Sequence, residues 1–200
     1  SAFRDCPRAG VPITHMYLPF FENWPSSLHD HFSYDVGKDM LGTFDDEYGR
    51  EIRSVGGDFM KHFNEKKWTR TQFQFFLNNK YYYYDPVKRP RNGTFWLLDE
   101  PMHRDDFLAL NHLGGLFREG ARPFKGAVNC AFRADVSRPV WQRDYLDRNL
   151  DVFCGSYSKP YVDRQMRRHD ESFNGPRVAW VYGGNNAVSQ SNLAAPAWIL

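Results

Sequence analysis

Two short polar clusters early in the chain contain the residue types that bind metal ions. His29 and His31 flank Asp30, and imidazole nitrogens at this spacing can ligate a transition metal. With no third ligand nearby, such a pair is more often part of a polar surface. Asp45–Glu47 is a run of three carboxylates that could bind a hard cation, but acidic residues at a helix start are commoner because they complement the helix dipole. Neither cluster by itself predicts a metal site.

A third cluster is basic and lies in the string VDRQMRRHDE. Its positive residues are Arg164, Arg167, Arg168 and His169. Acidic residues flank them on both sides, so the pattern favours a solvated or inter-subunit salt-bridge face over a nucleic-acid contact. We therefore expect the Arg164–Arg168 face to contact other protein subunits.

The three cysteines, Cys6, Cys130 and Cys154, cannot all pair with one another. Their spacing matches no zinc motif, so we interpret them as reduced thiols in a reducing compartment. Asn92-Gly93-Thr94 matches the acceptor pattern for N-glycosylation, but that modification belongs to the secretory route, which the thiols disfavour. We expect a protein that is not secreted.

The composition is that of a folded domain with nearly balanced charge. A hydrophobic fraction of 42% and an aromatic fraction of 17% are too high for a disordered chain. The 26 basic and 24 acidic residues leave a net charge of only +2, which argues against a polyanionic partner such as nucleic acid. No apolar run approaches the roughly 18 residues that a membrane helix requires. A domain with one main core and no membrane span is expected.

The elements that would position these residues divide the chain in two. Residues 1–57 are rich in proline, glycine, histidine and aromatic residues without a regular period, which predicts an extended arm that packs on a partner or on the chain's own core. Residues 58–200 show an α+β pattern. The expected elements are one or two helices in 58–77, a hairpin in 81–98, strands at 124–131, 151–155 and 177–182, and a helix at 140–149.

Several strings in the second part carry a family resemblance. They are YYYYDPVKRPRNGTFWLLDE (81–100), FKGAVNCAF (124–132), QRDYLDRNLDVFCGSYSKPYV (142–162) and FNGPRVAWVYGG (173–184) followed by NLAAPAWIL (192–200). Their order and approximate spacing resemble the DNA/RNA non-specific endonucleases of the endonuclease G type. This resemblance implies a ββα-metal fold, with a twisted antiparallel sheet and flanking helices, over residues 58–200.

The same resemblance implies where a nuclease site would lie. In that family a histidine of an Asp-Arg-Gly-His motif acts as general base, and an asparagine holds a divalent cation that stabilises the phosphate charge. His112 stands at the histidine position, but Ala109-Leu110-Asn111 replaces the preceding triplet. Gln142 stands near the metal position, with Asn129 as another oxygen donor. A lone histidine among Leu and Gly is more often structural.

The residues that the nuclease chemistry needs are replaced, while the strings that resemble the family's strands are kept. This pattern predicts a non-catalytic accessory subunit of a larger protein assembly. We expect its partners to bind the 1–57 arm and the Arg164–Arg168 face, and no cofactor to be needed. We expect a mitochondrial location, because the chain is mildly basic, its thiols are unpaired and many endonuclease G relatives are mitochondrial. The alternative is an active Mg²⁺-dependent nuclease with His112 as base and Gln142 or Asn129 near the ion.

Overall fold

The computed structural model describes residues 10, 13–20, 31, 44–78, 96–124, 129–136, 146, 150–156 and 178–182. Strands and helices alternate through the first part of this set. The elements are β1 (His15–Phe20), α3 (Asp46–Glu65), β2 (Gln72–Leu77), α4 (Arg104–Ala121), the 3-10 turn η2 (Arg122–Phe124), β3 (Asn129–Asp135), β4 (Val152–Ser156) and β5 (Val178–Tyr182).

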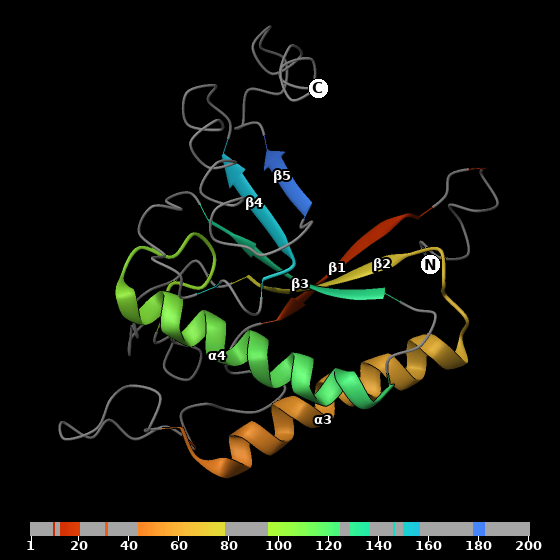
Figure 1. The fold of residues 1–200 in the computed structure, drawn as a ribbon, viewed down its shortest axis with the longest axis horizontal. Helices are drawn as coiled ribbons and strands as arrows, with labels where there is room; N and C mark the ends of the chain where they lie inside the picture. The colour runs from red at the N-terminus through yellow and green to blue at the C-terminus, as the bar shows by residue number, and fades with distance from the viewer. Residues whose placement is uncertain are drawn as a thin grey trace, which may run out of the picture.

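The five strands form one sheet in the order in which they occur along the chain, β1-β2-β3-β4-β5 (Figure 1). Every ladder between neighbouring strands is parallel. Helices α3 and α4 connect β1 to β2 and β2 to β3, and both lie on the same face of the sheet (Figure 1). Doubly wound sheets reverse their strand order and carry helices on both faces, whereas consecutive βα units of a barrel keep one direction. Strands β1 to β3 and their two connecting helices follow the second pattern.

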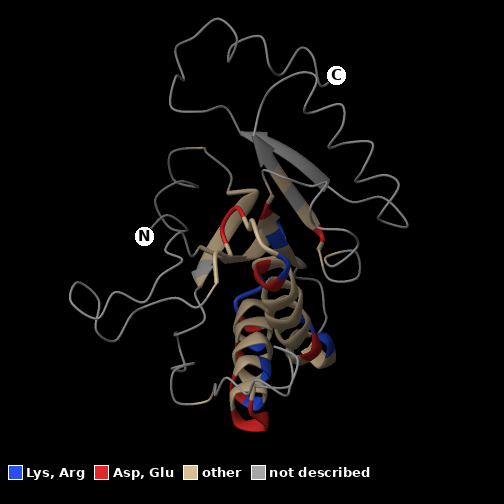
Figure 2. Ribbon diagram, turned by 90° about the vertical axis from the view of Figure 1, so that its left-hand side faces the viewer, with Lys and Arg blue, Asp and Glu red and all other residues tan. Residues whose placement is uncertain are grey.

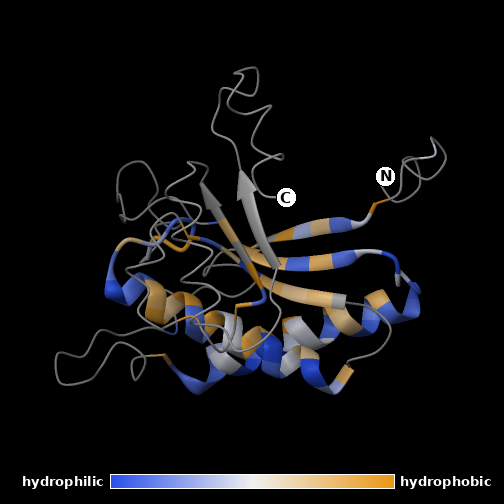
Figure 3. Cartoon of the chain, turned by 45° about the horizontal axis from the view of Figure 1, so that its top comes forward, coloured by the Kyte–Doolittle hydropathy of each residue, from blue (hydrophilic) through white to orange (hydrophobic). Residues whose placement is uncertain are grey.

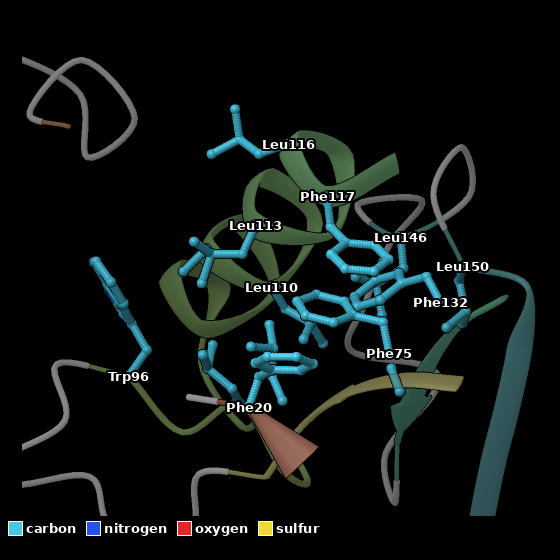
Figure 4. Close-up of a cluster of buried hydrophobic side chains, with 14 of the residues drawn as sticks. Phe20, Phe75, Trp96, Leu110, Leu113, Leu116, Phe117, Phe132, Leu146 and Leu150 are labelled. Carbon is cyan, nitrogen blue, oxygen red and sulfur yellow. The ribbon is translucent and has the colours of Figure 1, made fainter. Parts of the chain in front are cut away.

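The core forms because alternate strand residues face the helices. Phe20, Phe75 and Phe132, from three adjacent strands, belong to one buried cluster with Leu110 and Phe117 of α4 (Figure 4). The rings of Phe75 and Phe117 stack at 3.8 Å with an interplanar angle of 5°. Figure 3 shows the corresponding alternation of polar and apolar residues along β1 and β2. Burial of this aromatic layer holds α4 on the sheet.

The two helices approach closely because glycines lie where they cross. A Cβ atom at Gly56 would meet the carbonyl oxygen of Phe117, and one at Gly120 would meet the backbone of Arg53. Any larger residue at either position would push one helix backbone away from the other. The spacing of α3 and α4 therefore depends on these glycines.

Helix α3 begins with the acidic run that the sequence places at Asp45–Glu47. Asp45 is the N-cap, and its Oδ1 accepts a hydrogen bond from the Tyr48 backbone N–H at 2.8 Å. Asp46 and Glu47 occupy the first turn, where they complement the helix dipole. Figure 2 shows this acidic end, and both signs of charge along the two helices. The helix-start interpretation of this run is confirmed.

Of the three strands predicted after the hairpin, two match the structure closely and the third starts later. The strands expected at 151–155 and 177–182 are β4 and β5. The strand expected at 124–131 is β3, Asn129–Asp135, because Arg122–Phe124 still completes a 3-10 turn after α4. The helix expected at 140–149 lies outside the described residues except for Leu146, which is buried.

The helical prediction for residues 58–77 is wrong at its end. Helix α3 stops at Glu65, and Gln72–Leu77 is strand β2. Phe73, Phe75 and Leu77 alternate with Gln74 and Phe76, which face the other side of the sheet, so the period is two and not 3.6. The prediction missed α4 entirely, although its apolar residues recur at helical spacing: Phe107, Leu110, Leu113, Leu116 and Phe117.

The first 57 residues hold regular structure where they are described. His15–Phe20 is strand β1, paired with β2, and α3 runs through the expected boundary between residues 57 and 58. The described part of the arm thus includes strand β1 and the first part of α3. Met16, Leu18 and Phe20 of β1 pack on the core.

The mixture of helices and sheet agrees with the expected α+β class, but the antiparallel nuclease fold is not confirmed, since each described ladder is parallel. Most of the hairpin expected at 81–98 lies outside the described residues, and Trp96–Leu98 is not in a strand. Among the described residues, no helix is long and apolar enough to cross a membrane.

Candidate active site

His112 lies in the middle of α4, half-buried and packed against an aromatic ring. Its ring centroid is 4.6 Å from that of Phe44, just before α3. Burial lowers the pKa of His112 below its ordinary value, and the positive charge of Arg53 lowers it further, while Glu119 acts in the opposite direction. A neutral imidazole packed on an aromatic ring fits the structural interpretation of this histidine.

The other residues of the expected nuclease site are not brought to His112 by any described contact. Asn129 is the first residue of β3 and pairs with Gln72 in the ladder. Gln142 lies outside the described residues. Among the described residues, no three His, Cys, Asp or Glu side chains form a group that could hold a metal ion. The nuclease site stays a prediction.

Of the early histidine cluster, the structure describes only His31. Its Nδ1 lies 2.8 Å from Oδ2 of Asp45, the N-cap of α3. This hydrogen bond is the main reason why the pKa of His31 is raised. The pKa of Asp45 is lowered, chiefly by the hydrogen bond from the Tyr48 N–H. The pair therefore fixes the start of α3. Residues 92–94 and the Arg164–Arg168 face lie outside the described residues.

The sequence interpretation missed a pair of adjacent carboxylates, Asp99 and Glu100. They belong to residues 96–103, which we call the carboxylate loop and which leads into α4. Trp96 and Leu98 anchor the loop in the core. The Glu100 N–H donates to the carbonyl oxygen of Asp135, the last residue of β3, at 3.0 Å. The pair thus lies at the carboxyl edge of the sheet.

The two carboxylates differ in environment and backbone conformation. Asp99 is only 3% exposed, whereas Glu100 is partly exposed. Glu100 also has a positive φ of 63°, a conformation that residues other than glycine rarely adopt. Strained backbone of this kind concentrates at functional sites, where the surrounding structure holds it. The signal in the sequence was the string LLDEP, in which two acids directly follow an apolar run.

Asp106, in the first turn of α4, fastens the carboxylate loop from inside. Its side chain is completely buried. Oδ1 accepts a hydrogen bond from the Leu97 N–H at 3.1 Å, and Oδ2 accepts from the N–H groups of Met102 at 3.1 Å and His103 at 2.8 Å. Hydrogen bonds from backbone N–H groups stabilise a buried carboxylate. One side chain therefore joins the two ends of the loop around Asp99 and Glu100.

On the face of the sheet away from the helices, an ion pair lies at the end of β3. Arg133 donates from Nε and Nη2 to the two carboxylate oxygens of Asp135, at 2.9 and 3.2 Å. Its guanidinium lies 4.7 Å from the ring centroid of Phe76 and 5.9 Å from that of Tyr17. Both charged side chains are mostly buried. This two-point pairing fixes the strand end to which Glu100 is hydrogen-bonded.

The described cysteines are unsuited to nucleophilic chemistry. Cys130 and Cys154 are both free thiols. Burial raises the pKa of each thiol to about 12. Because the thiolate is the reactive form, a thiol with such a pKa is inert near neutral pH. Asp99 and Glu100, at the carboxyl edge of the described sheet, carry carboxyl groups, a kind of group that in general can give and accept a proton.

Comparisons with known proteins add no assignment: no family model matches the chain, and no match was found among curated proteins or among solved structures.

Proposed function

We propose that the protein is a hydrolase that cleaves glycosidic bonds by acid–base catalysis, with Asp99 and Glu100 as the catalytic residues. The observation that carries the proposal is the Asp99–Glu100 pair, held in a strained loop at the carboxyl edge of a parallel sheet. Two Asp or Glu carboxyl groups about 5–10 Å apart on either side of the glycosidic bond are the usual machinery of glycoside hydrolysis. Because the pair was missed in the sequence, the expectation of a non-catalytic subunit did not take it into account.

The strand topology supports this location for a site. Parallel strands that follow one another in order, with their helices on one face, are the repeating unit of (β/α) barrels. In barrels and in open parallel sheets, ligands bind at the carboxyl ends of the strands, where the loops that follow them converge. Asp99 and Glu100 lie at that edge through the hydrogen bond from Glu100 to Asp135.

Their unequal exposure suggests a division of roles. A general acid gives its proton to the leaving-group oxygen as the glycosidic C–O bond breaks. It takes a proton back from the water that then adds to the anomeric carbon, which suits the more exposed Glu100. A buried carboxylate that keeps its position suits the stabilisation of positive charge on the sugar ring, and we assign this role to Asp99. Such divergent environments are how two carboxyl groups take different roles in one site.

The experiment is a kinetic comparison of wild type, Glu100→Gln and Asp99→Asn on a panel of aryl glycosides. We expect Glu100→Gln to lower kcat/KM about 10²–10⁴-fold on substrates with poor leaving groups. The glycosidic bond of a dinitrophenyl glycoside breaks without a proton on the leaving oxygen, so kcat/KM of the same variant on these substrates should stay near the wild-type value. Asp99→Asn should slow both kinds of substrate. Asp105→Asn, which changes an exposed acid of α4, is the matched control.

Other outcomes would favour the functions expected from the sequence. Mg²⁺-dependent cleavage of plasmid DNA that is lost in His112→Ala would support a nuclease built on the ββα-metal fold. A wild-type protein that turns over neither glycosides nor nucleic acid would refute the hydrolase proposal. It would leave the non-catalytic accessory subunit, whose partners and mitochondrial location are still predictions.

A further inference from the structure

We propose that His31, Phe44 and Asp45 form a pH-sensitive latch that holds the carboxylate loop against helices α3 and α4. The latch is a property of the fold and does not depend on the proposed function, so its test needs no substrate. Its basis is that Phe44 packs on the loop and is connected to two histidines. It is connected to His31 through the neighbouring Asp45, and to His112 by direct ring contact.

Phe44 joins the carboxylate loop to the start of α3 through aromatic contacts. Its ring stacks on that of Trp96, the first residue of the loop, with 5.4 Å between the centroids and an interplanar angle of 24°. The same ring centroid lies 5.7 Å from that of Tyr48, in the first turn of α3. Trp96 and Tyr48 are both buried, so a displacement of Phe44 would expose apolar surface of two core side chains. The position of Phe44 and the order of the loop are therefore coupled.

His31 holds the backbone next to Phe44 at two points. The Asp45 N–H donates to the carbonyl oxygen of His31 at 3.1 Å, and Nδ1 of His31 lies 2.8 Å from Oδ2 of Asp45. The hydrogen bond to Asp45 raises the pKa of His31, and the negative charges of Glu47 and Glu51 on α3 act in the same direction. The protonated imidazole therefore makes the stronger bond. As pH rises through this raised pKa, His31 loses its charge and its hold on Asp45 weakens.

His112 responds to pH in the opposite direction. Its ring centroid lies 4.6 Å from that of Phe44. Burial lowers the pKa of His112, the positive charge of Arg53 lowers it further, and Glu119 acts against both. The neutral ring suits the contact with Phe44, whereas protonation at lower pH places a second positive charge near Arg53 in a half-buried position.

The two opposite shifts give the latch a pH optimum. The contribution of His31 is complete below the ordinary histidine pKa of 6.5 and is lost as pH rises through the raised value. The contribution of His112 is complete above 6.5 and is lost as pH falls through the lowered value. The hold on Phe44, and through it on the carboxylate loop, should therefore be strongest near pH 6.5.

The test is amide hydrogen exchange of the full chain between about pH 5 and about pH 8.5, a range that covers both titrations. Each rate is divided by the rate of the unfolded chain at the same pH, which removes the intrinsic pH dependence of exchange. Protection of the loop amides should be greatest near pH 6.5. It should fall about two- to fivefold towards each end, as expected for partly exposed charged contacts. Strand β2 (Gln72–Leu77) is the internal reference and should show no such maximum.

Single variants separate the parts of the latch. His31→Gln should remove only the fall in protection on the alkaline side, and His112→Leu only the fall on the acid side. Phe44→Ala should lower protection of the loop at every pH and abolish the maximum, although both histidines remain. The matched control is His62→Gln, which changes an exposed histidine in the last turn of α3 and should leave the profile unchanged.

Each remaining outcome would overturn the latch. A loop profile without a maximum near pH 6.5 would show that the two histidines do not control the loop. A maximum that survives Phe44→Ala would show that Phe44 does not transmit their effect. The same maximum in β2 would show that they act on the whole fold. If Phe44→Ala does not fold, Phe44→Leu keeps an apolar side chain without the stacked ring, and it must flatten the profile.

Discussion

Gly120→Ala tests the close approach of α3 and α4 directly. A Cβ atom at this position would overlap the carbonyl group of Arg53, and it would lie 2.6 Å from the Arg53 Cα. These are backbone atoms of a helix interior, so no side-chain rotation relieves the overlap, and the helices must separate by about 1 Å to restore a normal contact.

The expected change in stability follows from two opposing terms. Replacing glycine by alanine inside a helix normally stabilises it by about 1 kcal/mol. Overpacking a tight contact costs about 1–3 kcal/mol, and a backbone contact belongs at the upper end. The net loss should be about 2 kcal/mol, which lowers Tm by about 4–8 °C in a chain of this size.

Gly49→Ala is the matched control on α3. There the Cβ would lie 3.0 Å from Nη1 of Arg53, the end of a flexible side chain that can move away. We expect this variant to be as stable as wild type or slightly more stable, because only the helix-propensity gain remains. Urea unfolding followed by circular dichroism measures both variants. A Gly120→Ala protein as stable as wild type, or a Gly49→Ala protein that loses as much, would show that the glycine contact does not set the helix spacing.

Three further predictions follow from described contacts. Phe75→Ala removes the ring stacked on Phe117 at 3.8 Å and should cost about 3–5 kcal/mol in urea unfolding; a loss below about 1 kcal/mol would contradict the central role of this pair. The pKa of His31 is raised beside Asp45. The contribution of this pair to the stability of the folded protein is therefore complete below the ordinary histidine pKa of 6.5, and it is lost as pH rises through the pKa of His31 in the folded protein. The stability difference between wild type and His31→Ala should therefore be larger at about pH 5.5 than at about pH 8.5, and an equal difference would exclude the ion pair. Cys154, whose thiol pKa is raised to about 12, should resist iodoacetamide in the native protein at about pH 8 and react only after unfolding, as mass spectrometry of the modified peptide would show.

Local sequence signals were sufficient for several elements. The acidic run at Asp45–Glu47 indicates a helix start, where α3 begins, because a cap and a helix dipole act within one turn; the helix body up to residue 57 was assigned to the arm. The short apolar runs at β4 and β5 were recognised as buried strands. A folded domain follows from the apolar and aromatic content alone. These inferences need only residues that are neighbours in the chain.

Elements that depend on distant partners were misjudged. Residues 72–77 are apolar enough to form either a buried helix or a buried strand. They form a strand because they pair with β1 and β3. A parallel ladder joins segments that are far apart in sequence, so no local pattern reports it. For the same reason, the resemblance over residues 81–200 did not reveal that the described strands run parallel.

The candidate site shows the same division between sequence and tertiary structure. The sequence by itself determines that Asp99 and Glu100 are adjacent acids after an apolar run. Only the tertiary structure buries Asp99, gives Glu100 a positive φ and joins its N–H to the end of β3. It also turns Asp106 from an ordinary first-turn acid into the acceptor of three backbone N–H groups. The physical reason is that burial and hydrogen bonding depend on which segments meet at the sheet edge, and packing across the whole chain decides that.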